Sequence, residues 1–398
     1  MAVAEKIKGF MEKSSWIRKM FEQGTLLKAQ HGPDRVYDFS LGNPNVEPPE
    51  AVHQALEKCL REKKAALHAY MPNAGYPATR KAIAGFLTRE HGLAFSEKEV
   101  VMTCGAAGAL NVVLKALLNP GDELIVLSPY FVEYLFYIDN FQGVPKVVAT
   151  GADFQPDLQA IEQILSPKTK AILINSPNNP TGKVYGASAI SGLAELLTQY
   201  SRKFGQAIYL ISDEPYRKIV YDQVEVPSIF QAYSESILVT SYSKDLSLPG
   251  ERIGYLAVHP LAPDKGELIE AMTFTNRILG FVNAPALMQW ILPELQGLTV
   301  EVALYQKKRD LFYQALTRMG YELIKPEGAF YLFPKSPLPD DVAFVQALQE
   351  ELILTVPGTG FGSPGYFRIA YCVPDATIEN SLPGFEKVIK KFGAVQKF

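Results

Sequence analysis

The sequence is poor in cysteine and histidine. Its 398 residues include 3 cysteines and 5 histidines, and none of them stands at a CxxC, HxH or HExxH spacing. An odd number of cysteines without such spacing argues against both a disulfide framework and a thiolate zinc site. The scattered histidines provide no metal-binding motif. We therefore expect no bound metal and a reducing, cytoplasmic environment.

The sequence also lacks long apolar runs and an excess of charge of one sign. Its most apolar segment, residues 124–138, is interrupted by Pro129 and Glu133, and it falls short of the roughly 18 residues that a membrane helix needs. The N-terminal residues alternate charged and apolar side chains, unlike the apolar core of a signal peptide. The net charge of −3 gives no support to a nucleic-acid or acidic-membrane partner. We expect a soluble protein that binds neither nucleic acid nor membrane.

The composition is that of a globular protein with a large core. Hydrophobic residues make up 47% of the chain and charged residues 20%. The length suggests two or three domains, at about 150 residues each. We expect an N-terminal segment that joins the smaller domain (residues 1–48), a large domain (49–290) and a C-terminal small domain (291–398). A loop rich in glycine and proline at residues 41–49 suggests a crossing between domains.

Between residues 100 and 258, short apolar runs alternate with helical patterns. The runs lack the period-2 alternation of half-exposed strands, as expected for strands that helices cover on both faces. They lie at residues 124–127, 171–174, 207–211 and 236–240. This pattern predicts an α/β fold with a doubly wound, mostly parallel sheet, in which ligands bind beyond the carboxyl ends of the strands.

The last third of the chain predicts a smaller α/β lobe. Short strands are expected near residues 329–333 and 366–370, with helices at 340–350 and 376–391. Another helix is expected at residues 300–319, with Thr299 as its N-cap and Gly320 as its C-cap.

A single lysine stands in a loop rich in serine and glycine between two predicted strands. Lys244 lies in the motif SYSKDLSLPGERIGY (residues 241–255), after Ser241 and Ser243 and before Arg252. Loops held by rigid strands often carry catalytic groups. The hydroxyls and the guanidinium suit a phosphate, while the amine suits covalent chemistry. Taken alone, Lys244 also fits a solvated lysine in a polar turn.

Candidate binding residues follow three other predicted strands. Gly105, Ala106 and Ala107 open a helix whose N-terminal amides suit an anion, although a tight helix entry explains the same residues. Asn179 belongs to the motif NSPNNPTG (residues 175–182), which a structural turn explains only in part. Asp213 opens the motif DEPY (residues 213–216) at the end of a buried strand. A buried acid there needs a cation, whereas a capping acid at the surface does not.

A charged residue also lies within an apolar segment. Arg368 stands in the otherwise apolar residues 366–371. A guanidinium in such surroundings needs a carboxylate partner. The partner can come from the protein or from a ligand, and the sequence leaves both open.

Together these motifs resemble those of the class I and II aminotransferases, the fold-type I enzymes that use pyridoxal phosphate. The resemblance covers nearly the whole chain, with the three motifs in the order and at the spacing typical of the family. It implies a seven-stranded sheet, pyridoxal phosphate as cofactor and a homodimer with shared active sites. The implied reaction transfers an amino group between an L-amino acid and a 2-oxo acid by a ping-pong mechanism. 2-Oxoglutarate and glutamate are expected as one pair.

The resemblance also implies roles for individual residues. Lys244 is expected to hold the cofactor as a Schiff base and to act as general acid and base, and Asp213 to keep the ring nitrogen protonated. Tyr216 and Asn179 are expected at the ring oxygen, and Phe131 on the ring face. The implied phosphate ligands are Gly105, Ala106, Ala107, Ser241, Ser243 and Arg252, with Tyr70 reaching the phosphate site of the partner subunit. The implied ligands of the substrate carboxylate are Arg368, Asn179 and the backbone of Gly42.

The resemblance leaves the substrate and part of the function open. Some family members that act on aspartate carry a lysine in the phosphate loop, where this chain has Ala107. Arg277 is a candidate to replace that lysine, or else a surface residue at a helix end. The alternatives on the same fold are a carbon–sulfur β-lyase, which needs no acceptor oxo acid, and a non-catalytic regulator that binds the cofactor.

Overall fold

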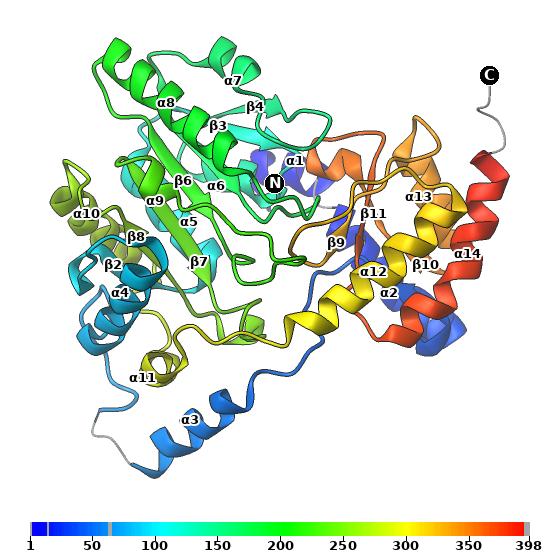
Figure 1. The fold of residues 1–398 in the computed structure, drawn as a ribbon, viewed down its shortest axis with the longest axis horizontal. Coiled ribbons are helices and arrows are strands. Elements are labelled where there is room, and N and C mark those ends of the chain that lie inside the picture. Colours follow the sequence, from blue (N-terminus) through cyan, green and yellow to red (C-terminus); the bar gives the residue numbers. More distant parts are fainter. Residues whose placement is uncertain (1, 14–15, 63–65, 394–398) are drawn as a thin grey trace.

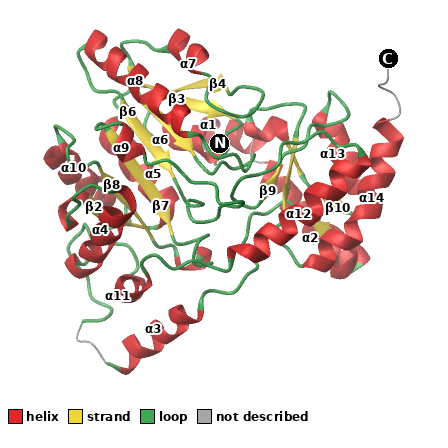
Figure 2. Ribbon diagram, viewed as in Figure 1, coloured by secondary structure: helices red, strands yellow, loops and turns green. Residues whose placement is uncertain are grey.

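Two lobes, each with sheets of its own, make up the fold in this computed structural model, which describes residues 2–13, 16–62 and 66–393. The larger lobe contains a seven-stranded sheet, and the smaller lobe contains a three-stranded and a two-stranded sheet. Figure 1 shows the larger lobe on the left and the smaller lobe on the right. In Figure 2 the helices of the larger lobe lie on both sides of its sheet.

The large sheet is parallel except for one strand. Its strands follow the order β2-β8-β7-β6-β5-β3-β4, and β8 runs antiparallel to both of its neighbours. The bounds are β2 (Val100–Thr103), β3 (Glu123–Ser128), β4 (Val144–Ala149), β5 (Thr169–Asn175), β6 (Tyr209–Asp213), β7 (Ser236–Ser241) and β8 (Gly254–Val258). The predicted doubly wound, seven-stranded sheet is confirmed. Strand β4 was not predicted, because it lies at the sheet edge and most of its residues are exposed or half-buried.

Helices bury both faces of this sheet. Ile172 and Leu210 belong to one core cluster, while their chain neighbours Leu173 and Ile211 belong to the cluster on the opposite face. This two-sided burial explains why the strands read as continuous apolar runs.

The helices of the larger lobe divide between the two core clusters. The first cluster involves α3 (Glu50–Arg61), α4 (Pro77–His91), α7 (Leu158–Ile164), α8 (Ala187–Phe204), α9 (Ile229–Ala232) and α11 (Ala286–Leu295). The second involves α5 (Gly105–Leu117), α6 (Glu133–Asn140) and α10 (Lys265–Ile278). Two short 3-10 helices, η2 (Glu97–Glu99) and η3 (Pro249–Glu251), complete the lobe.

The smaller lobe combines an early segment with the last third of the chain. Its core cluster joins Met20 and Phe39 to Phe312, Phe344 and Phe385. Strand β1 (Tyr37–Asp38) pairs in parallel with β10 (Ile353–Leu354), and β12 (Phe367–Ala370) pairs antiparallel with both β11 (Val356–Pro357) and β9 (Tyr331–Leu332). The helices are α2 (Trp16–His31), η1 (Pro33–Arg35), α12 (Val302–Met319), α13 (Asp341–Glu350), η4 (Gly358–Phe361) and α14 (Asp375–Gly393).

Helix α1 and the start of helix α12 need separate description. Helix α1 (Glu5–Lys13) contacts the larger lobe, where Phe10 packs against Phe136 with ring centroids 5.0 Å apart. Helix α12 ends at Gly320 as predicted, but Thr299 is not its N-cap, because the helix begins at Val302. The amide of Val300 donates to the carbonyl of Asp245 at 2.7 Å, which fixes this segment against the Lys244 loop instead of in the helix.

Strand register brings the polar strand ends together. Asn175 at the end of β5 pairs with Asp213 at the end of β6, and Ser241 at the end of β7 pairs with Gly254. A Cβ atom at Gly254 would lie 2.9 Å from the backbone of Gly105, so only glycine permits this close approach. The ends of β5, β6 and β7 therefore meet the start of α5 at one edge of the sheet.

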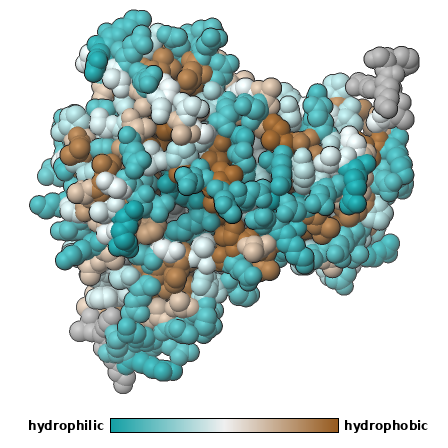
Figure 3. Space-filling view, viewed as in Figure 1, coloured by the Kyte–Doolittle hydropathy of each residue, from teal (hydrophilic) through white to brown (hydrophobic). Residues whose placement is uncertain are grey.

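Among the described residues, no helix has the length and apolarity to cross a membrane. On the face drawn in Figure 3, hydrophilic side chains prevail and apolar side chains form separate patches.

Replacing Gly254 tests the close approach of β8 to the start of α5. Gly254→Ala is expected to destabilise the fold by about 1–3 kcal/mol, because the added methyl group must displace backbone atoms on both sides. The midpoint of urea unfolding, followed by circular dichroism, measures the effect. Gly266→Ala is the control, since a Cβ there meets no atom within 4 Å. Equal midpoints for the two variants would contradict the packing described.

Candidate active site

Residues from distant parts of the chain meet in one cavity of about 340 Å³. It lies at the carboxyl ends of β5, β6 and β7. On the side of the smaller lobe, β12 and the segment before α3 border it. The predicted site residues that line it are Gly42, Ala106, Ala107, Phe131, Asn179, Asp213, Tyr216, Ser241, Ser243, Lys244, Arg252 and Arg368.

Lys244 occupies the middle of this set. Its Nζ donates a hydrogen bond to the carbonyl oxygen of Gly42 at 2.8 Å. Burial is the largest cause that lowers the pKa of Lys244 to about 8; the positive charges of Arg368 and Arg252 act in the same direction, and Cys372 opposes the shift. About a tenth of the amine is therefore uncharged at pH 7, far more than for an ordinary lysine, and the uncharged amine is the state that attacks a carbonyl carbon.

Asp213 presents one unpartnered oxygen to the cavity. Its Oδ2 accepts a hydrogen bond from the hydroxyl of Tyr134 at 2.5 Å, and its backbone oxygen accepts one from Asn175 at 2.8 Å. Its Oδ1 is buried without a hydrogen-bond partner. Burial raises the pKa of Asp213 to about 7, and the Tyr134 hydrogen bond works against that shift. A ligand nitrogen that donates to Oδ1 would satisfy the carboxylate and favour its charged form.

Arg368 lies buried with polar groups on one edge. Its guanidinium donates to Asn179 Oδ1 at 3.0 Å and to the carbonyl of Ser40 at 2.6 Å, while its Nε has no partner. The rings of Tyr331 and Phe361 flank it, each with its centroid 4.8 Å away. No carboxylate of the described chain forms an ion pair with it. The sequence left two possible sources for a carboxylate partner of Arg368, the protein and a ligand. Because the described chain supplies none, we expect the carboxylate to come from a ligand.

An anion site forms where α5 begins. Gly105, which precedes the lining residues Ala106 and Ala107 and is not itself one of them, has the left-handed conformation (φ +70°), and a Cβ there would lie 3.2 Å from Nη2 of Arg252. Ala106 and Ala107 follow in the first helical turn, whose amides have no partner within the helix. Arg252 is held by a hydrogen bond from Nη1 to the carbonyl of Pro249 at 2.9 Å. Helix amides and a fixed guanidinium together suit a phosphate.

Aromatic and amide groups form the walls between these sites. The hydroxyls of Tyr216 and Tyr331 share a hydrogen bond of 2.7 Å. Because Asn179 Oδ1 accepts from Arg368, its amide NH₂ group is left as a donor. Phe131 contacts Tyr134 edge to face, with centroids 5.6 Å apart.

Two other predicted residues lie outside the cavity of this single chain. Tyr70 is 87% exposed. Arg277 is exposed in the last turn of α10, where its guanidinium lies 5.2 Å from the ring of Phe274. Neither residue is among those that line the cavity.

Three cavity residues of helix α6 were missed from the sequence. Glu133, Tyr134 and Tyr137 line the cavity from one side of this helix. The spacing of Tyr137, three residues after Tyr134 and four after Glu133, was a usable signal, because residues three and four apart share a helix face. The segment was instead read as part of an interrupted apolar run.

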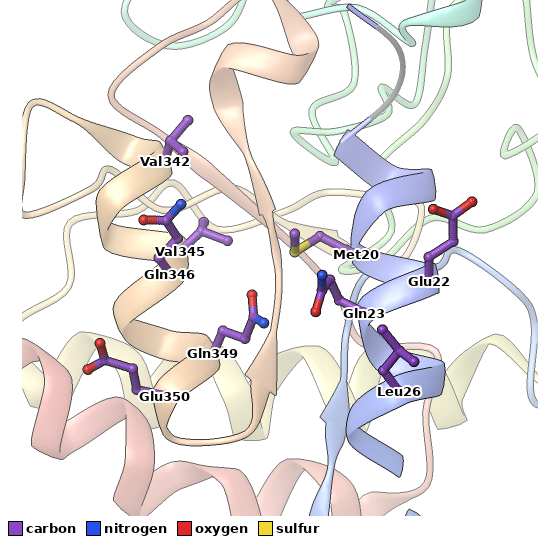
Figure 4. Close-up of a pocket in the computed structure, with 9 residues that line it drawn as sticks. All are labelled: Met20, Glu22, Gln23, Leu26, Val342, Val345, Gln346, Gln349 and Glu350. Atoms are coloured by element: carbon purple, nitrogen blue, oxygen red, sulfur yellow. The ribbon is translucent and has the colours of Figure 1, made fainter. Parts of the chain in front are cut away.

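A second hollow, between α2 and α13 in the smaller lobe, is shown in Figure 4. Its described lining residues supply carboxylates, amides and apolar groups, and they include no lysine, arginine, histidine or cysteine. This groove therefore lacks the anion-binding and nucleophilic groups of the first cavity.

Comparison with known proteins gives a consistent result over nearly the whole chain. A family model described as "Aminotransferase class I and II" matches residues 34–383. An aspartate/prephenate aminotransferase of Thermus thermophilus is 34% identical over 365 residues, which are 88% of this chain and 90% of that protein. A crystal structure of an amino transferase from Eubacterium rectale has 41% identity and a TM-score of 0.95, covering 98% of this chain and 99% of its own. An aspartate aminotransferase structure from Thermus thermophilus with maleate has 29% identity and a TM-score of 0.86, covering 98% and 100%.

The lowered pKa of Lys244 predicts a distinct pH dependence for its reaction with aldehydes. In protein stripped of any cofactor, the rate of salicylaldehyde addition to Lys244 should rise about tenfold per pH unit below pH 8 and level off above it. Borohydride reduction and peptide mapping at each pH measure this rate, with Lys244→Ala as the control for other lysines. A midpoint near the ordinary lysine value of about 10.4 would contradict the effect of burial.

Proposed function

The chain belongs to the class I and II aminotransferases, and on that premise we propose that Lys244 binds the cofactor covalently and moves the substrate proton. Members of this family depend on pyridoxal phosphate and transfer amino groups between amino acids and oxo acids, and this chain is such an enzyme. The observation that carries the assignment of residues is the meeting of Lys244, Asp213 and Arg368 in one cavity. Each supplies a different group that the reaction needs.

The residues present fit pyridoxal phosphate. Asp213 Oδ1 is a buried acceptor without a partner, which suits the protonated ring nitrogen of the cofactor. The start of α5, with Gly105 against Arg252, suits its phosphate. When bound, the cofactor accepts the electrons left on the substrate Cα as the proton leaves. Asp213 favours this by holding the ring nitrogen in its charged form.

We propose two roles for Lys244, in the covalent link and in proton transfer. Its lowered pKa supplies an uncharged amine for the covalent link. Once an incoming amino group has displaced it, the same Nζ is free to take the proton from Cα and return it as general acid and base. The carbonyl of Gly42, now its hydrogen-bond partner at 2.8 Å, holds the amine in the centre of the cavity.

Substrate orientation is assigned to Arg368 and its neighbours. The planar guanidinium, with Nε unpartnered, matches the α-carboxylate of an amino acid. Fixing this carboxylate orients the Cα–H bond toward Lys244. Asn179 and the Gly42 backbone are proposed to assist.

The remaining residues are proposed to hold the cofactor. The hydroxyl of Tyr216 and the amide of Asn179 are assigned to its ring oxygen, and Phe131 to the ring face. The phosphate is assigned to Gly105, Ala106, Ala107, Ser241, Ser243 and Arg252. These assignments are supported by their places around one cavity.

We also propose a homodimer in the cytoplasm. The exposed Tyr70 does not reach the cavity of its own chain, which fits a residue that completes the site of a partner subunit. The three cysteines form no disulfide, in keeping with a reducing compartment. The reaction is proposed to be ping-pong, with glutamate and 2-oxoglutarate as one pair.

The relatives favour transamination over the alternatives. Those compared above are named aminotransferases, not lyases or regulators. A screen of the twenty amino acids against 2-oxoglutarate, oxaloacetate and pyruvate tests the function. Pyruvate and ammonia formed from a cysteine conjugate without any acceptor would instead favour the β-lyase.

Removing the amine tests the role of Lys244. Lys244→Ala should lower kcat by more than about 1000-fold, because both covalent binding and proton transfer are lost. Cofactor should still bind through the phosphate site, but borohydride should no longer fix it to the protein. Absorbance spectra, peptide mapping and steady-state kinetics measure these effects. Activity well above a trace would reject the assignment.

Removing the guanidinium tests the role of Arg368. Arg368→Ala should raise KM for amino acids about 10- to 100-fold, since charged hydrogen bonds contribute about 1.5–3 kcal/mol. Cofactor occupancy should stay unchanged. Kinetics are measured together with the thermal unfolding midpoint. A variant that fails to fold would identify Arg368 as a structural residue instead.

A further inference from the structure

One acidic residue of the cavity has no part in the roles assigned above. Glu133, the first residue of α6, lines the cavity together with Lys244, Asp213 and Arg368. Its Oε2 is buried and has no hydrogen-bond partner. Tyr134, the next residue, already donates its hydroxyl to Asp213. The Glu133 carboxyl is therefore open to a ligand.

Glu133 and Arg368 line the same cavity, and the charge of Arg368 acts on the Glu133 carboxyl. Burial raises the pKa of Glu133, and its own backbone amide and the charge of Arg368 work in the opposite direction. The two side chains nevertheless form no ion pair in the described chain. Arg368 is hydrogen-bonded to Asn179 and Ser40, and its Nε and the Oε2 of Glu133 are both buried without a partner.

Among the described residues of this single chain, those that line the cavity leave no cation for a second carboxylate. The lysine and arginines that line it are Lys244, Arg252 and Arg368. Lys244 is assigned to the cofactor carbon, Arg252 to the phosphate and Arg368 to the α-carboxylate. Of the two acids, Asp213 is assigned to the ring nitrogen. The charged group left for the substrate side chain is thus an acid.

We propose that Glu133 reads the far end of the substrate side chain, favouring a terminal hydrogen-bond donor and disfavouring a second carboxylate. The favoured class is amino acids that end in an amide, hydroxyl or ammonium group, which can donate to Oε2. Aspartate and glutamate would place a second carboxylate beside the Glu133 carboxyl, and like charges at close range repel each other. Glutamate and 2-oxoglutarate are expected to react less efficiently than glutamine and its oxo acid.

This inference rests on the proposed function and is tested first by binding. Maleate and its half-amide maleamate differ in one carboxylate, and calorimetry on the holoenzyme gives the ratio of their Kd values. The wild type should bind maleamate more tightly. Glu133→Gln should reduce this preference at least tenfold, and Glu133→Ser is a second variant in case the first is unstable.

Asp139 provides a matched control on the same helix. It forms an ion pair with Lys6 at 2.6 Å and does not line the cavity. Asp139→Asn removes the same charge from α6 and should leave the maleate-to-maleamate ratio unchanged. A shift equal to that of Glu133→Gln would show a general effect of charge and would overturn the inference.

Kinetics provide the second readout. The ratio of kcat/KM for glutamine to kcat/KM for glutamate should be at least tenfold lower in Glu133→Gln than in the wild type. Unchanged ratios, or a wild type that prefers the dicarboxylates, would overturn the role of Glu133 alone. Failure to transfer an amino group from any donor would instead contradict the proposed function.

Discussion

The structure depends on keeping the carboxylate of Asp213 buried at the end of β6. Burial makes the charged form costly, and the pKa near 7 reflects that cost. Tyr134 from α6 donates to Oδ2 of the carboxylate, Asn175 from β5 donates to the backbone oxygen of Asp213, and Oδ1 is left for a ligand. A parallel sheet makes this arrangement possible, because the carboxyl ends of adjacent strands lie at one edge.

The positively charged groups of the cavity influence the pKa of Lys244. Lys244 shares a buried space with Arg368 and Arg252, so both arginines add to the effect of burial in lowering its pKa. The planar guanidinium groups of these arginines suit the hydrogen-bond geometry of carboxylates and phosphates. One cavity thus holds binding groups for carboxylate and phosphate beside an amine of lowered pKa.

The site exists only where the two lobes meet. Lys244 and Asp213 belong to the larger lobe, while Arg368 comes from β12 of the smaller lobe. Tyr216 of the larger lobe is part of the core cluster of the smaller lobe, and its hydroxyl bonds to Tyr331. Packing between the lobes therefore positions the substrate-binding groups relative to the amine.

The sequence by itself determined the doubly wound sheet and the family. Two-sided burial imposes continuous apolar strands, and the motifs around Asp213 and Lys244 are local in the chain. Tertiary structure alone decided that Arg368 has no carboxylate partner among the described residues, that Tyr134 supports Asp213, and that Glu133 faces the cavity. These facts depend on which segments pack together across long separations in the chain. Periodicity reports only how each segment is buried, so it could not supply them.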